Sequence, residues 1–446
     1  MELGSWSIIQ PGTPWALLAL IPLVVYIVMV FMGKSNNAGI FTGIVVGALL
    51  LGQGLPELAS QFLTSLGSST AMIGLIIMTG AGLGLLMNKA RITHTLVYWI
   101  VKRIGVNTQT KAKLVLIISS IIICGLLGTL GGGNAVIAPI IIPIMASLKI
   151  TPSTTATLFK TAGEIGLILG PLTGVTLITM KVTGLSYGTL MIGACIPFAI
   201  VWMLGTWFAT KRTQRRTAGK EEYEVTEDMQ DVSDIIVNRR SKINTIIFLV
   251  AFVGLIVYGI LAKQGTSYAL IVMIILSAVV AICGRMKIDD AISTLIKGIA
   301  SQADMFVLFV TIDVLLTMVS VGGGFDALSQ LLGHLSQGSP TAVMLIASVV
   351  GGLGIEAAAV AEIQIISDMF GQSAMAAGLP MTMFAIALLA ATRLTGSIYP
   401  TSNLMGQLGI ARAHNTKEVL QACWIAAAVV AIALVIWSFV GVAILT

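Results

Sequence analysis

The stretch LLGTLGGGNAV, residues 126–136, interrupts an apolar run at 114–148 that is too long for one helix across a bilayer. A second long apolar run, 340–375, is interrupted by SVVGGLGIEAA at residues 348–358. Glycines at membrane depth break a helix, and lipid offers no partner for the freed N–H and C=O groups. Such backbone is tolerated only where protein or a water-filled cavity satisfies it. The two stretches therefore predict two re-entrant hairpins around a polar site.

The composition places the whole chain in the membrane class. Of its 446 residues 57% are hydrophobic and 10% are charged, and the mean hydropathy is +0.99. A soluble protein of this length has too little polar surface in such a composition to face water. Apolar runs of about 18 to 25 residues predict transmembrane helices. The first run, near Pro14, has no basic residue before it and is predicted to be a retained helix and not a secretory signal.

The positions of the basic residues predict the topology. When both long runs are treated as hairpins, all but four of the 25 Lys and Arg fall in loops on one side, which the positive-inside rule makes cytoplasmic. Lys181 and Lys263 fall outside, and Lys160 and Arg393 lie within apolar segments. The prediction is about ten transmembrane helices, with both termini outside the cell. The formal charge of +6 is explained by these loops, so no nucleic-acid partner is expected.

The order of segments predicts two inverted repeats in an all-α polytopic fold. The first repeat is 1–210, a charged cytoplasmic linker is 211–242, and the second repeat is 243–446. Each repeat has a hairpin (114–148 and 340–375) followed by a broken helix (153–180 and 381–403). Five crossings per repeat is an odd number, so the repeats must be inverted.

The two broken helices also share a faint sequence likeness. GEIGLILGPLTG at 163–174 lies where RLTGSIYPTSN lies at 393–403. The register that aligns Pro171 with Pro400 also aligns Glu164 with Arg393. Two interpretations of this charged pair stay open: they pair with each other and brace the bundle, or Arg393 meets a substrate carboxylate while Glu164 takes a proton.

The hairpin tips and the breaks predict the site residues. Helix N-termini at a break carry partial positive charge that suits an anion, and free carbonyls suit Na⁺ or a proton carrier. The alternative is that the glycines only permit close helix packing. The residues expected to form the site are Thr129, Gly131, Gly132, Gly133, Asn134, Glu164, Thr173, Glu356, Arg393, Thr395, Ser397, Thr401, Ser402 and Asn403.

Other charged residues at membrane depth are assigned by position. Glu356 at the second hairpin tip is the best candidate for a coupling carboxylate, or else it reaches an outer aqueous vestibule. Glu362, Asp368 and Asp313 are weaker candidates. The Lys160 side chain is expected to extend toward the inner interface.

No motif points to catalysis or to a cofactor. The three histidines lack metal-ligand spacing, the four cysteines lie in apolar segments, and no Walker or nucleophile-elbow motif is present. An enzyme is therefore not expected, and the only ions expected are transported or coupling Na⁺ or H⁺.

The layout resembles the ion transporter superfamily of secondary carriers, and within it most closely the gluconate permease family. The similar stretches are LGLLMNKARI (83–92), APIIIPIMASL (138–148), GPLTG (170–174) and YGTLMIGACIP (187–197). SIYPTSN (397–403) is similar to the serine-asparagine-threonine sites of sodium-coupled dicarboxylate carriers. The resemblance implies a homodimer in which one domain scaffolds the interface while the hairpin domain moves.

These observations predict a secondary active transporter in a cell membrane, with a bacterial inner membrane favoured. It would move a small organic anion, a carboxylate or sugar acid, coupled to H⁺ or Na⁺ by alternating access. The alternative is a Na⁺/H⁺ antiporter, because buried acids outnumber buried bases. A channel or membrane enzyme is a third class, disfavoured by the repeats.

Overall fold

The computed structural model describes residues 7–223, 237–336, 338–354 and 358–445. Within these ranges the secondary structure is helical, without a strand. Eight helices are long and apolar enough to cross a membrane. A ninth span is formed by α8 (Pro152–Leu169) and α9 (Gly174–Thr183), which are bent by 46° at their break. The predicted all-α polytopic fold is confirmed.

The helices follow the same order twice along the chain. Each half has two apolar helices, a short amphipathic helix, a long apolar helix, a second short amphipathic helix, two hairpin helices, a broken helix and a long final helix. The first half comprises η1 (Pro14–Leu20) with α1 (Ile21–Phe31), α2 (Asn36–Leu51), α3 (Leu55–Leu66), α4 (Ser69–Lys89), α5 (Ile92–Ile104), α6 (Gln109–Leu127), α7 (Leu130–Ser147), α8, α9, and α10 (Tyr187–Leu190) running through η2 (Met191–Cys195) into α11 (Ile196–Thr217). The second comprises α12 (Arg239–Leu261), α13 (Tyr268–Gly284), α14 (Ile288–Ala300), α15 (Ala303–Val321), α16 (Gly324–Ser336), α17 (Pro340–Gly354), α18 (Ala359–Ala376), α19 (Met381–Ile398), α20 (Ser402–Ile410), and α21 (Thr416–Ile436) with η4 (Trp437–Gly441) and α22 (Val442–Leu445).

Four short helices, α3, α5, α14 and α16, are additional to the segments that the sequence analysis named. In α14 the apolar side chains of Ile288, Ile292 and Ile296 are exposed along one face, while acidic residues begin the helix and Lys297 lies in its last turn. Such a pattern suits a helix that lies along a membrane surface. These helices are too short to span a bilayer, so the long apolar runs of the sequence did not predict them.

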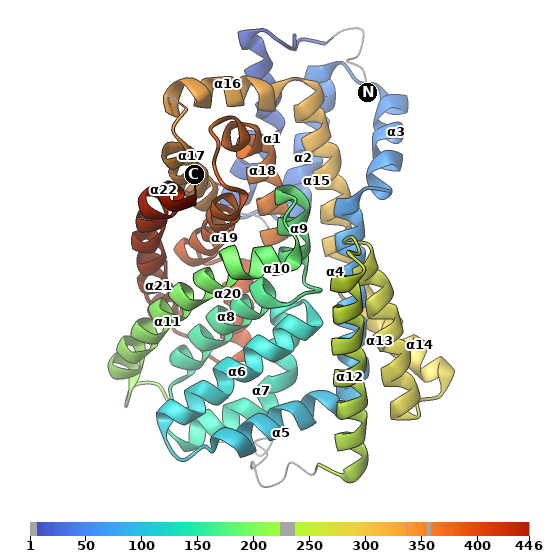
Figure 1. Ribbon diagram of the computed structural model, residues 1–446, viewed down its shortest axis with the longest axis vertical. Coiled ribbons are helices and arrows are strands. Elements are labelled where there is room, and N and C mark those ends of the chain that lie inside the picture. Colours follow the sequence, from blue (N-terminus) through green and yellow to red (C-terminus); the bar gives the residue numbers. More distant parts are fainter. Residues whose placement is uncertain (1–6, 224–236, 337, 355–357, 446) are drawn as a thin grey trace.

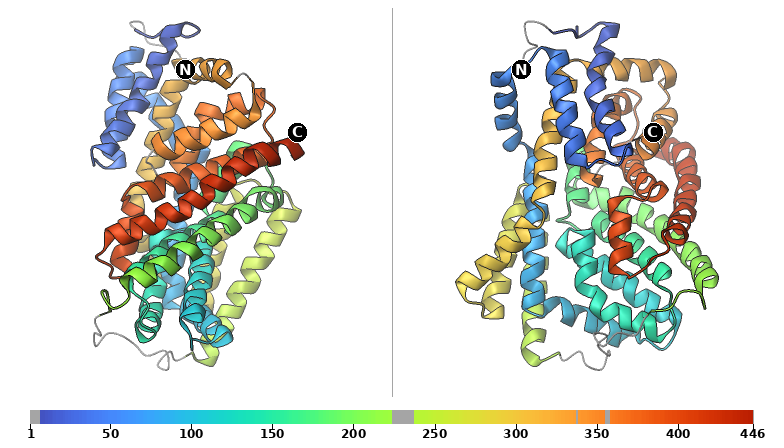
Figure 2. Two further views of the ribbon diagram at one scale, coloured as in Figure 1. Left: turned by 90° about the vertical axis from the view of Figure 1, so that its left-hand side faces the viewer. Right: turned by 180° about the vertical axis from the view of Figure 1, so that it is seen from behind.

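The two halves meet in the middle of the molecule. Figure 1 shows α6 and α7 toward one end and α16 to α18 toward the other, with the broken helices between them. The helices α1 and α22 lie toward the end opposite the one where α12 begins (Figure 1). The final long helices of the halves, α11 and α21, pack side by side along a diagonal (Figure 2).

Local chemistry ends each broken helix in the same way. Pro171 and Pro400 lack an N–H, so neither can continue the hydrogen bonds of the helix before it. Thr173 then caps α9 by accepting a hydrogen bond from the Thr176 N–H, and Thr401 caps α20 by accepting one from the Leu404 N–H. Each half therefore places a new helix N-terminus near the middle of the fold.

The first hairpin turns at a left-handed glycine. Gly128 has φ +68 and ends α6, and α7 begins two residues later. A Cβ on Gly133 would lie 2.6 Å from Cys124 Sγ, so the two hairpin helices pack too closely for a larger residue. At the first hairpin, one glycine therefore ends α6 and another permits the close packing of α7 against α6.

Candidate functional site

A cavity of about 80 Å³ lies where the two hairpins and the two broken helices meet. It has room for a handful of water-sized groups, at roughly 10–15 Å³ each. Two further contributors come from α2 and α15. The lining residues are Asn36, Leu130, Glu164, Leu167, Met305, Ala358, Ala359, Glu362, Thr392, Arg393, Thr395, Gly396, Thr401, Ser402 and Asn403.

Three helix N-termini reach this cavity. Leu130 begins α7, Ala359 begins α18 and Ser402 begins α20, and all three line it. Neither α7 nor α18 has a side-chain hydrogen bond at its N-cap. Free N–H groups and the helix dipole give such ends partial positive charge, which favours an anion.

A buried cluster of three charged side chains, Lys160, Glu164 and Arg393, reaches the cavity through the last two. Glu164 Oε1 lies 3.0 Å from Lys160 Nζ and 3.3 Å from Arg393 Nη1. All three side chains are nearly inaccessible to solvent, and Lys160 Nζ also lies 3.4 Å from Ser397 Oγ and 5.7 Å from the Trp202 ring centroid. Two cations therefore share the Glu164 carboxylate, and a second buried carboxylate, that of Glu362, lines the same cavity.

The cluster corrects the prediction made for Lys160. Its side chain does not extend toward the inner interface but is 1% exposed and pairs with Glu164 one helical turn away. A buried ammonium is stable only when paired, and both the Glu164 carboxylate and the Trp202 ring supply that stabilisation. Lys160 is thus a central residue that the sequence analysis missed.

One oxygen of the cluster is unused. Glu164 Oε2 is buried and accepts no hydrogen bond within the described part of the chain. Arg393 Nε donates to Thr392 Oγ1 at 3.2 Å, and Arg393 lines the cavity. An unpartnered carboxylate oxygen and an arginine on the lining provide one position for a cation or proton and one for an anion.

The second hairpin is tied to α19 by a hydroxyl. Thr395 Oγ1 donates to Glu362 Oε1 at 2.7 Å, and the carbonyl oxygens of Gly351 and Gly352 lie 3.2 and 3.1 Å from the same hydroxyl. Oxygen atoms from α17, α18 and α19 therefore gather at one edge of the cavity.

The first hairpin is tied to α20 by an amide. Asn134 Nδ2 donates to Gln407 Oε1 and to the Phe159 carbonyl, both at 2.7 Å, and Asn134 Oδ1 accepts from Ser120 Oγ at 2.6 Å. Gln407 lies in the second half of the chain, so this buried network joins the halves. The contact between Asn134 and Gln407 was not evident from the sequence, because no residue near either position indicates it.

The predicted site residues separate into three groups. Those that line the cavity are Glu164, Arg393, Thr395, Thr401, Ser402 and Asn403. Those that support it or lie beside it are Gly133, Asn134 and Ser397, with buried Thr129 and exposed Gly131 and Gly132 at the first hairpin tip. Thr173 is a buried helix cap outside the lining, and Glu356 lies outside the described residues.

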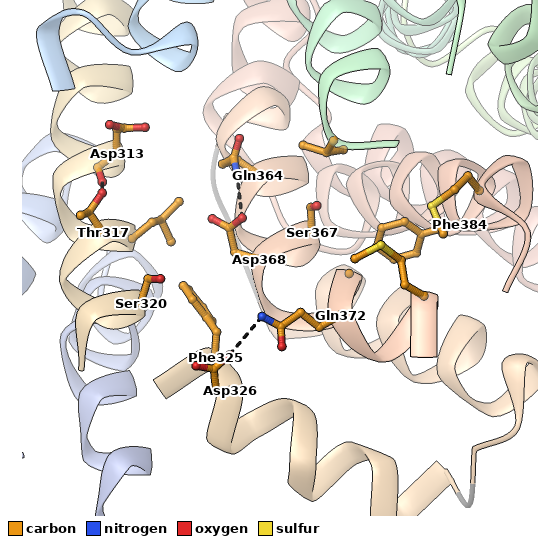
Figure 3. Close-up of a pocket in the computed structure, with 15 residues that line it drawn as sticks. Asp313, Thr317, Ser320, Phe325, Asp326, Gln364, Ser367, Asp368, Gln372 and Phe384 are labelled. Atoms are coloured by element: carbon orange, nitrogen blue, oxygen red, sulfur yellow. Dashed lines mark hydrogen bonds between the residues drawn. The ribbon is translucent and has the colours of Figure 1, made fainter. Parts of the chain in front are cut away.

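A second cavity, of about 360 Å³, lies between α15, α16 and α18 (Figure 3). Asp313, Asp326 and Asp368 line it from these three helices. Gln364 Nε2 donates to Asp368 Oδ1, and Gln372 Nε2 donates to Asp326 Oδ1. The cavity is acidic, and it contains two of the residues, Asp313 and Asp368, that the sequence marked as weaker candidates.

The family model of the DctM component of tripartite ATP-independent periplasmic transporters matches residues 23–440. The chain belongs to the DctM family. It is therefore the membrane component of an ATP-independent transporter, and it is a multi-pass membrane protein by family and by its apolar helices. No curated protein matches this DctM chain.

A solved structure shares the fold of this DctM chain. It is MtrF of Neisseria gonorrhoeae, which is described as one of a class of antimetabolite efflux pumps. The TM-score is 0.63 and the sequence identity 13%, with 99% of this chain and 96% of MtrF covered. At that identity the likeness establishes the arrangement of helices and not the cargo.

The family corrects the resemblance to gluconate permeases, which is not supported. The wider assignment to secondary carriers agrees with an ATP-independent transporter. The error has a simple origin, because the resemblance depended on the order of hairpins and broken helices, which is a property of architecture.

Proposed function

We propose that this DctM chain moves a small organic anion, with a carboxylate bound in the central cavity. The observation that carries the proposal is the meeting of Arg393 with the N-termini of α7, α18 and α20 at one small cavity. A guanidinium and uncapped amides are the groups that bind carboxylates best, through charge-assisted hydrogen bonds.

The charge of the cluster supports an anion over a neutral solute. Lys160 already neutralises Glu164 at 3.0 Å, so Arg393 is not required for that purpose alone. An arginine kept at membrane depth is costly unless it is paired. A substrate carboxylate would complete its charge balance whenever the site is filled.

We also propose that a cation accompanies the anion. The free Glu164 Oε2, and the oxygen atoms of Thr395, Glu362, Gly351 and Gly352, offer positions for a proton or Na⁺. The acidic cavity lined by three aspartates would raise the local concentration of cations at that side of the protein.

The proposed movement is alternating access between inverted repeats. The repeated helix order and the equivalent broken helices support two halves that exchange roles. On this proposal α6–α7 enters the membrane from the cytoplasm, α17–α18 enters from outside, and both termini lie outside. The family description, a component of a tripartite periplasmic system, supports function together with two other components. The homodimer stays a prediction.

Uptake by proteoliposomes tests the function. The purified chain, alone and with its partner components, is given radiolabelled mono- and dicarboxylates with and without a Na⁺ or pH gradient. Gradient-driven accumulation of a carboxylate is expected. Absence of accumulation for every carboxylate, with folded protein in the vesicles, contradicts the proposal.

A Na⁺/H⁺ antiporter is the second candidate, favoured by the unpartnered Glu164 Oε2 and the three aspartates of the acidic cavity. The same vesicles loaded with a pH-sensitive dye separate the two. Sodium-driven proton flux without any organic solute supports the antiporter, and flux that requires a carboxylate supports the anion carrier.

A further inference from the structure

A third cavity, of about 660 Å³, lies apart from the central site, between α9–α10 and α12–α13. Its volume falls within the range of about 300–1,000 Å³ that is usual for pockets with a specific ligand. The α9–α10 side contributes Leu177, Met180 and Leu185, and the α12–α13 side contributes Ile256, Ile260 and Tyr268. Its walls are therefore mainly apolar.

The tyrosines of this cavity present only their rings. Tyr187 Oη donates to the Leu169 carbonyl at 2.9 Å, and Tyr268 Oη donates to the Leu255 carbonyl at 3.0 Å. Since both hydroxyls already donate to backbone carbonyls, neither has a proton left to donate to an anionic ligand. The part of a ligand that lies against these rings must be apolar.

The cavity lies at an apolar outer face of the protein. Only 17% of the most apolar stretch of α12 is buried in the protein, and the side chains of Val257, Ile260 and Leu261 are exposed beside the cavity. The Tyr258 and Tyr268 rings lie 6.1 Å apart near the end of α12, as expected for aromatic residues at headgroup level. A ligand from the bilayer therefore has direct access.

A single cation stands at the rim. Lys263 is exposed in the turn after α12, with φ +51, and lines the cavity together with Gln264. The lining contains no carboxylate among the described residues, and Lys263 has no ion-pair partner there. An apolar groove with one unpaired cation at headgroup depth complements a lipid with net negative charge.

We propose that this groove binds one anionic phospholipid. An acyl chain lies between α9–α10 and α12–α13, and the phosphate meets the Lys263 ammonium. The bound lipid fills the gap between the broken helix of the first half and the first two helices of the second half.

Substitutions at Lys263 and Gly188 test the charge and the groove of the proposal separately. Lys263→Ala removes the charge, and Lys263→Arg keeps it. Gly188→Trp fills the groove, because a Cβ on Gly188 meets nothing within 4 Å and the residue lines the cavity. Gly254→Trp is the matched control: it is an exposed position on α12 with equally open space, outside the lining.

The test is native mass spectrometry of the full chain taken from vesicles with equal amounts of phosphatidylglycerol and phosphatidylcholine. One retained phosphatidylglycerol per chain is expected for the wild type, the arginine variant and the Gly254→Trp control. Lys263→Ala should lower the ratio of phosphatidylglycerol to phosphatidylcholine about fivefold, the effect of one cation near a charged headgroup. Gly188→Trp should retain neither lipid.

The proposal is overturned by no enrichment of phosphatidylglycerol in the wild type, or by an unchanged ratio in Lys263→Ala. Equal retention in the two tryptophan variants also overturns it. If Gly188→Trp does not fold, shown by its unfolding temperature, the lysine variants still decide.

Discussion

Replacement of Arg393 by glutamine should separate substrate binding from folding. In the native cluster Glu164 Oε1 lies 3.3 Å from Arg393 and 3.0 Å from Lys160. When Arg393 is neutral, Glu164 keeps its lysine partner, so no buried charge is left alone. The variant should therefore fold, and it should lose mainly its affinity for the anion.

The size of that loss follows from the burial of Arg393, which is 3% exposed. Truncation of one partner of a buried, hydrogen-bonded charge pair costs about 2–5 kcal/mol. The lower bound corresponds to about a 30-fold rise in the dissociation constant of the anion.

The assay measures carboxylate uptake in proteoliposomes and, in parallel, the unfolding temperature. Lys89→Gln is the matched control, because Lys89 also pairs with a carboxylate, that of Asp290 at 3.9 Å, but both side chains are exposed. It should transport normally, since exposed ion pairs contribute little. Wild-type affinity in Arg393→Gln, or a loss of folding equal to its loss of transport, would refute the reasoning.

Four further outcomes are expected. Glu164→Gln leaves the buried Lys160 and Arg393 without their shared carboxylate, which should lower the free energy of unfolding by about 3–5 kcal/mol. The unfolding temperature should therefore fall more than in Arg393→Gln, and equal unfolding temperatures would contradict this. Asn134→Ala leaves Gln407 Oε1 without a donor, which should lower the free energy of unfolding by about 1–3 kcal/mol. Both the unfolding temperature and the uptake should fall, and unchanged values of both would count against the network. Thr173→Ala removes a helix cap outside the cavity lining, so it should cost about 0.5–2 kcal/mol while uptake persists; lost uptake at unchanged stability would place Thr173 in the site. Burial, with Arg91 nearby, lowers the pKa of His94 from 6.5, so protonation favours the unfolded state. The His94 contribution to stability is therefore full above pH 6.5 and falls as the pH drops below it. The His94→Gln variant should lose less stability in acid than the wild type, and an identical pH–unfolding profile would contradict this.

The sequence predicted most of what depends on local chemistry. The helix ends at Pro171, Pro400 and Gly128 could be placed without coordinates. The expected break at Gly131 to Gly133 was wrong, because these glycines lie inside α7, as Pro139 also does. The register of the halves also paired Glu164 with Arg393, which the structure places 3.3 Å apart.

What the sequence could not predict depends on tertiary neighbours. Lys160 resembles a residue that reaches the interface until Trp202 and Ser397 are placed around it. Gln407 gives no local sign that it meets Asn134 from the other half. Thr173 and Thr401 both cap helices, but only Thr401 lines the cavity, a difference that the sequence alone does not show.

The central claim, that broken backbone encloses an anion site, is tested most directly by protection of a thiol at Ser402. Ser402 is exposed and lines the cavity, and Cys283 is the one cysteine that is not buried, so Ser402→Cys is placed in a Cys283→Ser background. The rate of modification by an anionic, membrane-impermeant thiol reagent is then measured with increasing transported carboxylate. The account predicts labelling that slows as the carboxylate saturates the site. Labelling at the same rate with and without a carboxylate that the protein transports would contradict it.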